Sequence, residues 1–153
     1  MAKTGDNSMK ALVETLNGAL ADHLALYVKT KNFHWHMAGP RFRDLHLLFD
    51  EQAAQILSVT DAIAERVRKN DAATLTSIGA IAQATAVKDQ DDTKLASEAM
   101  VAELLADNER LVARLKEVKD ASEEANDNAT SGIVDEWTDL AEERVWFLRQ
   151  TTR

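Results

Sequence analysis

The chain has 153 residues and a formal net charge of −8, with one proline, five glycines and no cysteine. The lack of cysteine excludes disulfides and thiolate metal sites, and the acidic balance argues against a broad basic surface for nucleic acid. No apolar run approaches the roughly 20 residues needed to cross a bilayer, and the first ten residues lack the apolar centre of a secretion signal. We therefore expect one soluble, cytoplasmic domain over residues 1–153, built from long helices.

The first predicted helix is long and stops at a sharp break. The pair Asn7-Ser8 supplies good N-cap side chains, so residues 1–8 are expected to form a short tail. Apolar residues then recur at helical spacing to about Met37. The pair Gly39-Pro40 ends this helix, because proline disfavours helical backbone in the residue before it. Pro40 is also well placed to open the next helix.

Three more long helices and one short helix are predicted after the break. The connection over 71–91 lacks a strong apolar pattern and is long enough to cross a bundle. The expected elements are a second helix over 40–69, a short helix within 75–84, a third helix over 92–120 capped by Asp92, a break over 122–128, and a fourth helix ending before a tail at 151–153. Two helical hairpins joined by a long crossover are the ferritin-like arrangement.

The second predicted helix has ionisable side chains along one side. At about 100° per residue, four of them point to roughly 0°, 40°, 60° and 100°: His46, Asp50, Asp61 and Glu65. Within each pair, His46 with Asp50 and Asp61 with Glu65, the side chains lie one turn apart. Imidazole combined with carboxylates suits iron, manganese or zinc. About 16 Å of helix rise separates Asp50 from Asp61, so one chain cannot close both pairs around one ion.

An antiparallel copy of the same helix can bring the two pairs together. If a two-fold axis passes near residues 55 and 56, position 46 faces position 65 and position 50 faces position 61. Such a dimer would hold two equivalent sites, each shared between two chains. His34 ends the first helix, and the Gly-Pro turn folds it back toward the second. The sequence therefore predicts a shared metal site formed by His34, His46, Asp50, Asp61 and Glu65.

The other histidines and the tryptophans are given simpler interpretations. His23 shares the first-helix face of His34, but a structural role is favoured. His36 points away from His34 by about 200° and is at most an accessory ligand. The three tryptophans are interpreted first as core or interface residues: Trp35, Trp137 and Trp146.

The ligand spacing has the form H-x11-H-x3-D-x10-D-x3-E, and this chain satisfies every position. Together with HW at 34–35, LLFD at 47–50, TDAIAER at 60–66 and WF near the C-terminus, it makes the sequence resemble the Dps family of mini-ferritins. The resemblance covers about residues 10–150. It implies an all-α, ferritin-like four-helix bundle with a short crossover helix, assembled as a hollow dodecamer. It also implies that His34, His46 and Asp50 come from one chain, and Asp61 and Glu65 from its neighbour across a two-fold interface.

The activity implied by the resemblance is that of a ferroxidase. Such a protein oxidises Fe(II) to Fe(III), with hydrogen peroxide preferred over dioxygen, and stores ferric mineral in its cavity, which protects DNA from oxidative damage. Iron is the expected metal, with two ions at each shared site. Trp35, beside His34, and Trp146 are candidate electron donors that quench stray oxidant. Asp127 and Asp135 are candidate pore residues, with capping or simple solvent exposure as the alternative.

Two other functions stay open at this point. Family members that compact DNA often carry a flexible basic tail, whereas Lys3 and Lys10 are the only basic residues among the first ten here. Direct DNA binding is therefore expected to be weak or absent at physiological salt. One alternative is a nucleoid-associated, DNA-binding structural protein with little iron chemistry. The other is a cage that binds zinc or manganese structurally, since zinc does not change its oxidation state.

Overall fold

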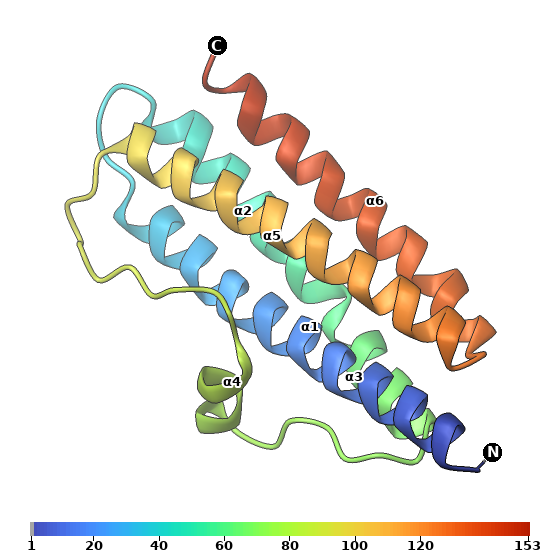
Figure 1. The fold of residues 1–153 in the computed structure, drawn as a ribbon. Helices are drawn as coiled ribbons and strands as arrows, with labels where there is room; N and C mark the ends of the chain where they lie inside the picture. Colours follow the sequence, from blue (N-terminus) through green and yellow to red (C-terminus); the bar gives the residue numbers. More distant parts are fainter. Residues whose placement is uncertain (1) are drawn as a thin grey trace.

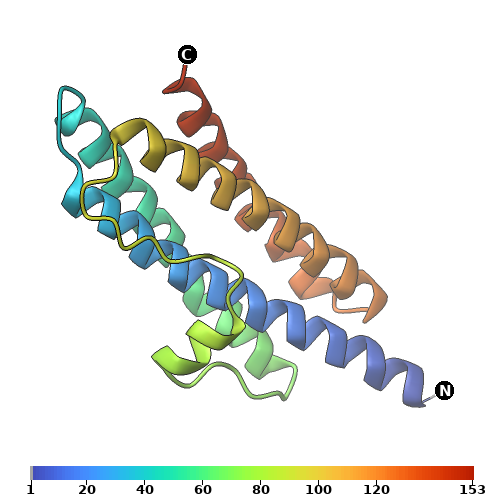
Figure 2. The same ribbon diagram turned by 60° about the vertical axis from the view of Figure 1, so that its left-hand side comes forward.

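The computed structural model describes residues 2–153, with side chains from residue 7 onward, and shows four long helical rods packed side by side (Figure 1). The rods are α1 (Ala2–His36), α2 followed by α3 (Phe42–Ser58 and Thr60–Lys69), α5 (Ser97–Glu124) and α6 (Asn128–Gln150). Helix α1 packs against α2, α3 and α5, and α5 packs against α6. The two termini lie at opposite ends of the bundle (Figures 1 and 2). The predicted all-α, four-helix arrangement is confirmed.

The connection between α3 and α5 crosses the bundle alongside α1 (Figure 2). It contains the short helix α4 (Ile78–Ala84), which confirms the helix predicted within 75–84. A buried carboxylate of α1 anchors it, because Asp22 Oδ1 accepts hydrogen bonds from Thr85 Oγ1 at 2.8 Å and from the Ala86 N–H at 2.7 Å. The crossover is therefore fixed to the bundle at its midpoint by a polar contact.

The core lies along the axis between the rods. Side chains with almost no solvent exposure come from every rod: Leu16, Phe33, Phe49, Ile56, Ile63, Leu115 and Trp137. Burying such apolar faces stabilises long helices far more than their intrinsic propensity does. The burial of Trp137 confirms its interpretation as a core residue. Trp35 and Trp146 differ, because each leaves more than half of its surface exposed in the single chain.

The starts of the first two rods differ from the prediction. Helix α1 begins at Ala2, so Asn7-Ser8 lies inside the helix, and the predicted tail over 1–8 is helical from residue 2. No proline in this segment forces a later start. Helix α2 begins at Phe42 instead of Pro40. Gly39 has φ +105°, which glycine adopts without strain, and the Gly39 carbonyl accepts from the Phe42 N–H at 3.0 Å.

The third rod also starts and ends later than predicted. Helix α5 covers Ser97–Glu124, with Ala96 before its first turn. The Asp92 carboxylate accepts a hydrogen bond from the Lys94 N–H at 2.9 Å, so it closes a local turn instead of capping the helix. The break after this helix is correspondingly shorter than the predicted one over 122–128.

The second rod is bent, whereas an uninterrupted helix over 40–69 is predicted. The break lies at Val59, between α2 and α3. On either side of it, Ser58 Oγ donates to the Gln55 carbonyl at 2.6 Å and Thr60 Oγ1 donates to the Leu57 carbonyl at 2.7 Å. Hydroxyls that bond to carbonyls one turn back compete with the helical ladder and bend helices. The bend separates the two predicted ligand pairs, so the uniform angle of 100° per residue does not hold between Asp50 and Asp61.

Candidate metal centre

Two of the predicted ligands, His34 and His46, stack against each other where α1 and α2 meet. Their ring centres are 3.8 Å apart and their planes differ by 11°. Phe42 stacks on the other side of His46, with ring centres 4.9 Å apart. The Gly39 turn therefore returns the chain as predicted and brings the two imidazoles to one place. Their first contacts are with each other and with an aromatic ring.

The orientation of both rings is set by the backbone of the opposite helix. Nδ1 of His34 donates to the carbonyl of His46 at 2.6 Å, and Nδ1 of His46 donates to the carbonyl of His34 at 2.7 Å. A carbonyl only accepts, so Nδ1 must carry the proton in each ring. In the neutral tautomer that this hydrogen bond selects, Nε2 is unprotonated and is the nitrogen available to a metal ion. Each helix thus fixes the tautomer of the other helix's histidine.

Asp50 lies one turn further along α2 and is the third of the predicted ligands near this junction of α1 and α2. Its Oδ1 is 3.7 Å from Nε2 of His34 and 2.8 Å from Nζ of Lys31. The hydrogen bond from Lys31 lowers the pKa of Asp50, assisted by the nearby positive charge. The carboxylate is about half exposed. It is therefore an accessible carboxylate, favoured in its ionised form, beside an imidazole nitrogen. Lys31 was not singled out in the sequence, although it lies one turn before His34 on the same face of α1.

The other two predicted ligands lie on α3, beyond the bend. Asp61 and Glu65 are both exposed, and neither forms an ion pair with any side chain that the structure describes. Within the described part of the chain, no group of three or more histidines and carboxylates is placed to hold an ion by itself. The single chain thus keeps the two ligand groups apart, as the helix rise requires. Whether they meet across a two-fold axis stays a prediction.

The remaining histidines have local partners. His23 is fully buried, and its Nδ1 donates to the Ala19 carbonyl at 2.7 Å, which agrees with a structural role. Burial lowers the pKa of His23 to about 4. His36 is exposed, and its Nδ1 lies 2.7 Å from the side-chain oxygen of Asn32. Its hydrogen-bond partner is thus Asn32 on its own helix, and the role of His36 as an accessory ligand stays a prediction.

The two acidic pore candidates are held by other groups. Asp127 caps α6 and accepts hydrogen bonds from Arg66 at 2.9 Å, from Asn70 at 2.9 Å and from the Thr130 N–H at 3.1 Å. Burial alone would raise the pKa of Asp127, but these hydrogen bonds outweigh it and lower the pKa to about 2. Its capping interpretation is therefore the right one. Asp135 is exposed and pairs with Lys119 at 3.1 Å.

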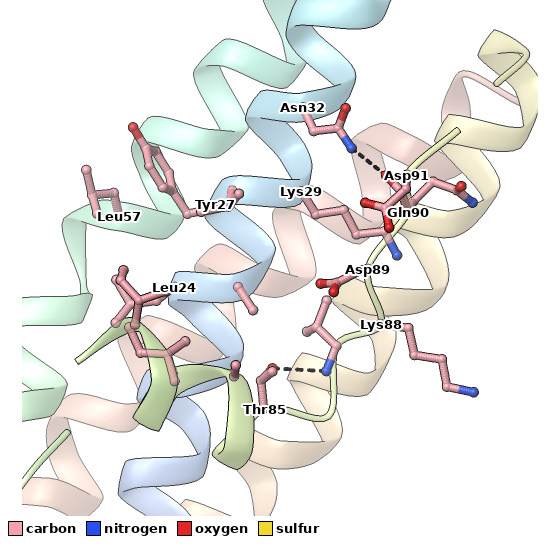
Figure 3. A pocket seen from close by; sticks show the side chains of 16 residues that line it. Leu24, Tyr27, Lys29, Asn32, Leu57, Thr85, Lys88, Asp89, Gln90 and Asp91 are labelled. Atoms are coloured by element: carbon pink, nitrogen blue, oxygen red, sulfur yellow. Dashed lines mark hydrogen bonds between the residues drawn. The ribbon is translucent and has the colours of Figure 1, made fainter. Parts of the chain in front are cut away.

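A largely apolar cleft of about 360 Å³ lies between α1, α4 and residues 85–91 (Figure 3). Leu24 and Tyr27 of α1, Leu57 of α2 and Ile78 of α4 contribute apolar surface to it. Ile78 is 82% exposed and Leu57 is 41% exposed, although both are large hydrophobic residues. Leu57 lies one residue past the position of the predicted two-fold axis. An exposed apolar surface therefore adjoins the predicted axis.

Known proteins are similar to this chain in both sequence and fold. The ferritin-like domain family matches residues 13–153. The DNA protection during starvation protein of Brevibacillus brevis is 34% identical over 142 residues, which is 92% of this chain and 95% of that protein. Among solved structures, Dps from Thermosynechococcus elongatus has a TM-score of 0.93 at 25% identity and covers 97% of this chain and 94% of its own. A Dps protein from Bacillus brevis has a TM-score of 0.91 at 29% identity, with coverage of 96% and 98%.

These matches place the chain in the ferritin-like class of four-helix proteins. Within that class, it belongs to the Dps family. The fold class expected from the resemblance is thereby confirmed, and the fold is compatible with the expected hollow dodecamer. Iron storage and DNA protection are the general functions that this membership supports. No helix of the described residues is both long and apolar enough to cross a membrane.

Proposed function

We propose that this protein is a cytoplasmic ferroxidase and iron store that oxidises Fe(II), preferably with hydrogen peroxide, at sites shared between chains of a dodecamer. The observation that carries the proposal is the reciprocal pair of hydrogen bonds between His34 and His46. Each bond uses Nδ1 on a backbone carbonyl and leaves Nε2 as a lone-pair donor. Side chains prepared in this way are typical of metal-binding histidines, whose second nitrogen is fixed by a neighbouring acceptor.

Sharing of each site between two chains accounts for the exposed carboxylates. Asp61 and Glu65 lie on an open face of α3, on the same rod as Asp50. A two-fold axis near residues 55 and 56 would bring them to the partner's imidazoles and Asp50. The apolar cleft beside Leu57 supports this choice of face, because a second copy would cover the exposed Leu57 and Ile78 (Figure 3).

The donor set suits two Fe(II) ions as substrate. Hard carboxylate oxygens favour Fe(III) over Fe(II) and so promote loss of an electron. Oxidation of two Fe(II) ions by one peroxide supplies two electrons, breaks the O–O bond and, with two protons, gives two waters. No hydroxyl radical is released in this balance, which is how removal of iron and peroxide together would protect DNA. Trp35 adjoins His34 and is 62% exposed, so it is accessible as a donor to stray oxidant.

The test is anaerobic Fe(II) loading followed by stoichiometric peroxide, with iron oxidation and peroxide loss recorded together. Wild type is compared with the double variant Asp61→Ala, Glu65→Ala. A matched control removes Asp120 and Glu124, two exposed carboxylates at the same spacing on α5. We expect fast oxidation near two Fe(II) per peroxide in wild type and in the control, and its loss in the α3 variant. Equal rates in all three proteins would contradict the proposal.

Two side branches of the proposal have separate tests. Trp35→Phe should raise hydroxyl-radical yield during turnover while iron oxidation proceeds; an unchanged radical yield would remove Trp35 from the mechanism.

The alternative function, a DNA-binding structural protein with little iron chemistry, predicts a stable complex with plasmid DNA. At a net charge of −8 per chain we expect no mobility shift at physiological salt near neutral pH. A clear shift there would favour the alternative.

A further inference from the structure

The ammonium group of Lys31 contacts one of the predicted metal ligands. Nζ of Lys31 lies 2.8 Å from Oδ1 of Asp50, and the same oxygen is 3.7 Å from Nε2 of His34. The Lys31 side chain is 20% exposed, and Asp50 is the carboxylate that its ammonium contacts. The ammonium therefore lies beside the carboxylate and imidazole atoms that a metal ion would have to use.

We propose that Lys31 is a resident counter-cation, which holds Asp50 in the metal-free protein and leaves this carboxylate when a divalent cation binds. The inference rests on the proposed function of the same site. Its physical basis is that a carboxylate oxygen bonded to an ammonium cannot also accept a divalent ion at contact distance without strong repulsion between the two cations. Lys31 then lowers the affinity of the site and delays its filling until the free metal concentration rises.

The geometry gives the ammonium a second place to go. Its Nζ is 5.7 Å from the centre of the Trp35 ring, which is within the range of a cation–π contact. Lysine has a flexible four-carbon stem and a compact charge, so a small rotation moves Nζ from the carboxylate toward the ring face or into water. Release of Asp50 therefore does not leave the ammonium buried without a partner.

The expected effect is moderate. Ion pairs with one partly exposed member contribute little, and the relief of repulsion between ammonium and metal adds to the gain. We expect removal of the charge to tighten metal binding roughly two- to tenfold. Zn²⁺ is the probe, because it binds imidazole and carboxylate ligands but is not oxidised. Its affinity is therefore independent of turnover.

The experiment titrates Zn²⁺ by calorimetry into the assembled, metal-free, full-length protein. The variants are Lys31→Met, which keeps length without charge, and Lys31→Arg, which keeps the cation. Lys31→Gln is the second uncharged variant, and circular dichroism with size-exclusion chromatography checks folding and assembly. Each substitution is also made in an Asp50→Asn background. We expect tighter binding in the Met and Gln variants, wild-type affinity in the Arg variant, and a clearly smaller gain once Asp50 is neutral, because only the direct repulsion between ammonium and metal then remains.

The outcomes separate the two proposals. Equal or weaker Zn²⁺ binding in the uncharged variants overturns the role of Lys31, and so does an equal gain in the Asp50→Asn background. The variant Asp61→Ala, Glu65→Ala tests the site itself. If that variant binds Zn²⁺ like wild type, the shared site is refuted and Lys31 has nothing to exclude. If it loses Zn²⁺ while the uncharged Lys31 variants behave like wild type, only the inference on Lys31 fails.

Discussion

His23 makes the bundle sensitive to acid, through a buried ring that cannot accept a proton without cost. Its side chain is fully buried in α1, and its Nδ1 donates to the Ala19 carbonyl at 2.7 Å. Its Nε2 has no hydrogen-bond partner in the described structure. Protonation would place a charge there, near the buried guanidinium of Arg144. Burial therefore lowers the pKa of His23 to about 4 from 6.5, with a further lowering by Arg144.

The sign and size of the effect follow from this gap. Above pH 6.5 the ring is neutral in both folded and unfolded chains and makes no difference. As the pH falls below 6.5, the unfolded chain binds a proton that the folded chain refuses, so stability decreases until about pH 4. A difference of about 2.5 pH units corresponds to about 3 kcal/mol per chain at about 1.4 kcal/mol per unit.

Replacing His23 with leucine should remove this loss. Denaturant unfolding at equal protein concentration, at pH 7 and at pH 4.5, measures it. Between pH 7 and pH 4.5, the free energy of unfolding of wild type should fall by most of about 3 kcal/mol because of His23. In His23→Leu this part of the decrease should be absent, whatever the stability of the variant at pH 7. His36→Gln is the control, because His36 is exposed. The reasoning is refuted if wild type and His23→Leu show the same pH dependence.

Three further predictions concern other contacts. Asp127→Ala should lower the free energy of unfolding by about 2 kcal/mol near neutral pH. Because the pKa of Asp127 is lowered to about 2, this difference from wild type should shrink as the pH falls from about 4 to 2. Denaturant unfolding across that pH range measures the difference, and a constant difference would contradict the argument. A Cβ at Gly18 would lie 2.9 Å from Cζ of Arg114, whose Nε donates to Asp22 at 3.1 Å. Because this close approach opposes the gain in helix propensity, Gly18→Ala should stabilise the protein by about 1 kcal/mol only when Arg114 is also replaced by alanine. An equal gain in thermal melts with and without Arg114 would exclude the contact. The last prediction mixes two inactive variants, one lacking both site histidines and one lacking both α3 carboxylates. Co-refolding them in equal amounts should restore about a quarter of the wild-type rate of Fe(II) oxidation, because random pairing of chains leaves that fraction of shared sites intact. No recovery in the mixed assembly would argue against sites shared between chains.

The rods were predictable because their signals are long and repeated. Apolar residues at helical spacing define each rod, and many weak preferences add up over 20 or more residues. Helix ends and bends depend on single hydrogen bonds, which compete with alternatives of similar energy. In the sequence, nothing distinguishes Ser58 and Thr60 from other residues within a helix. Only the structure shows that their hydroxyls donate to backbone carbonyls three residues earlier. Asp92 likewise is a good cap by type, and only the turn that it closes shows that it caps nothing.

The candidate site divides in the same way between what spacing can show and what it cannot. Sequence spacing identifies side chains that share a helix face. It therefore predicted that His34 and His46 lie close together and that Asp61 and Glu65 lie too far away to join them within one chain. It carries no information on where Nδ1 of each ring donates, because that depends on a carbonyl of another helix. Lys31 lies at a spacing that could have revealed it, but a lysine beside a carboxylate on a helical surface is too common to signify a site. Its importance comes from the oxygen that it contacts, since Asp50 cannot serve the ammonium and a metal ion at once.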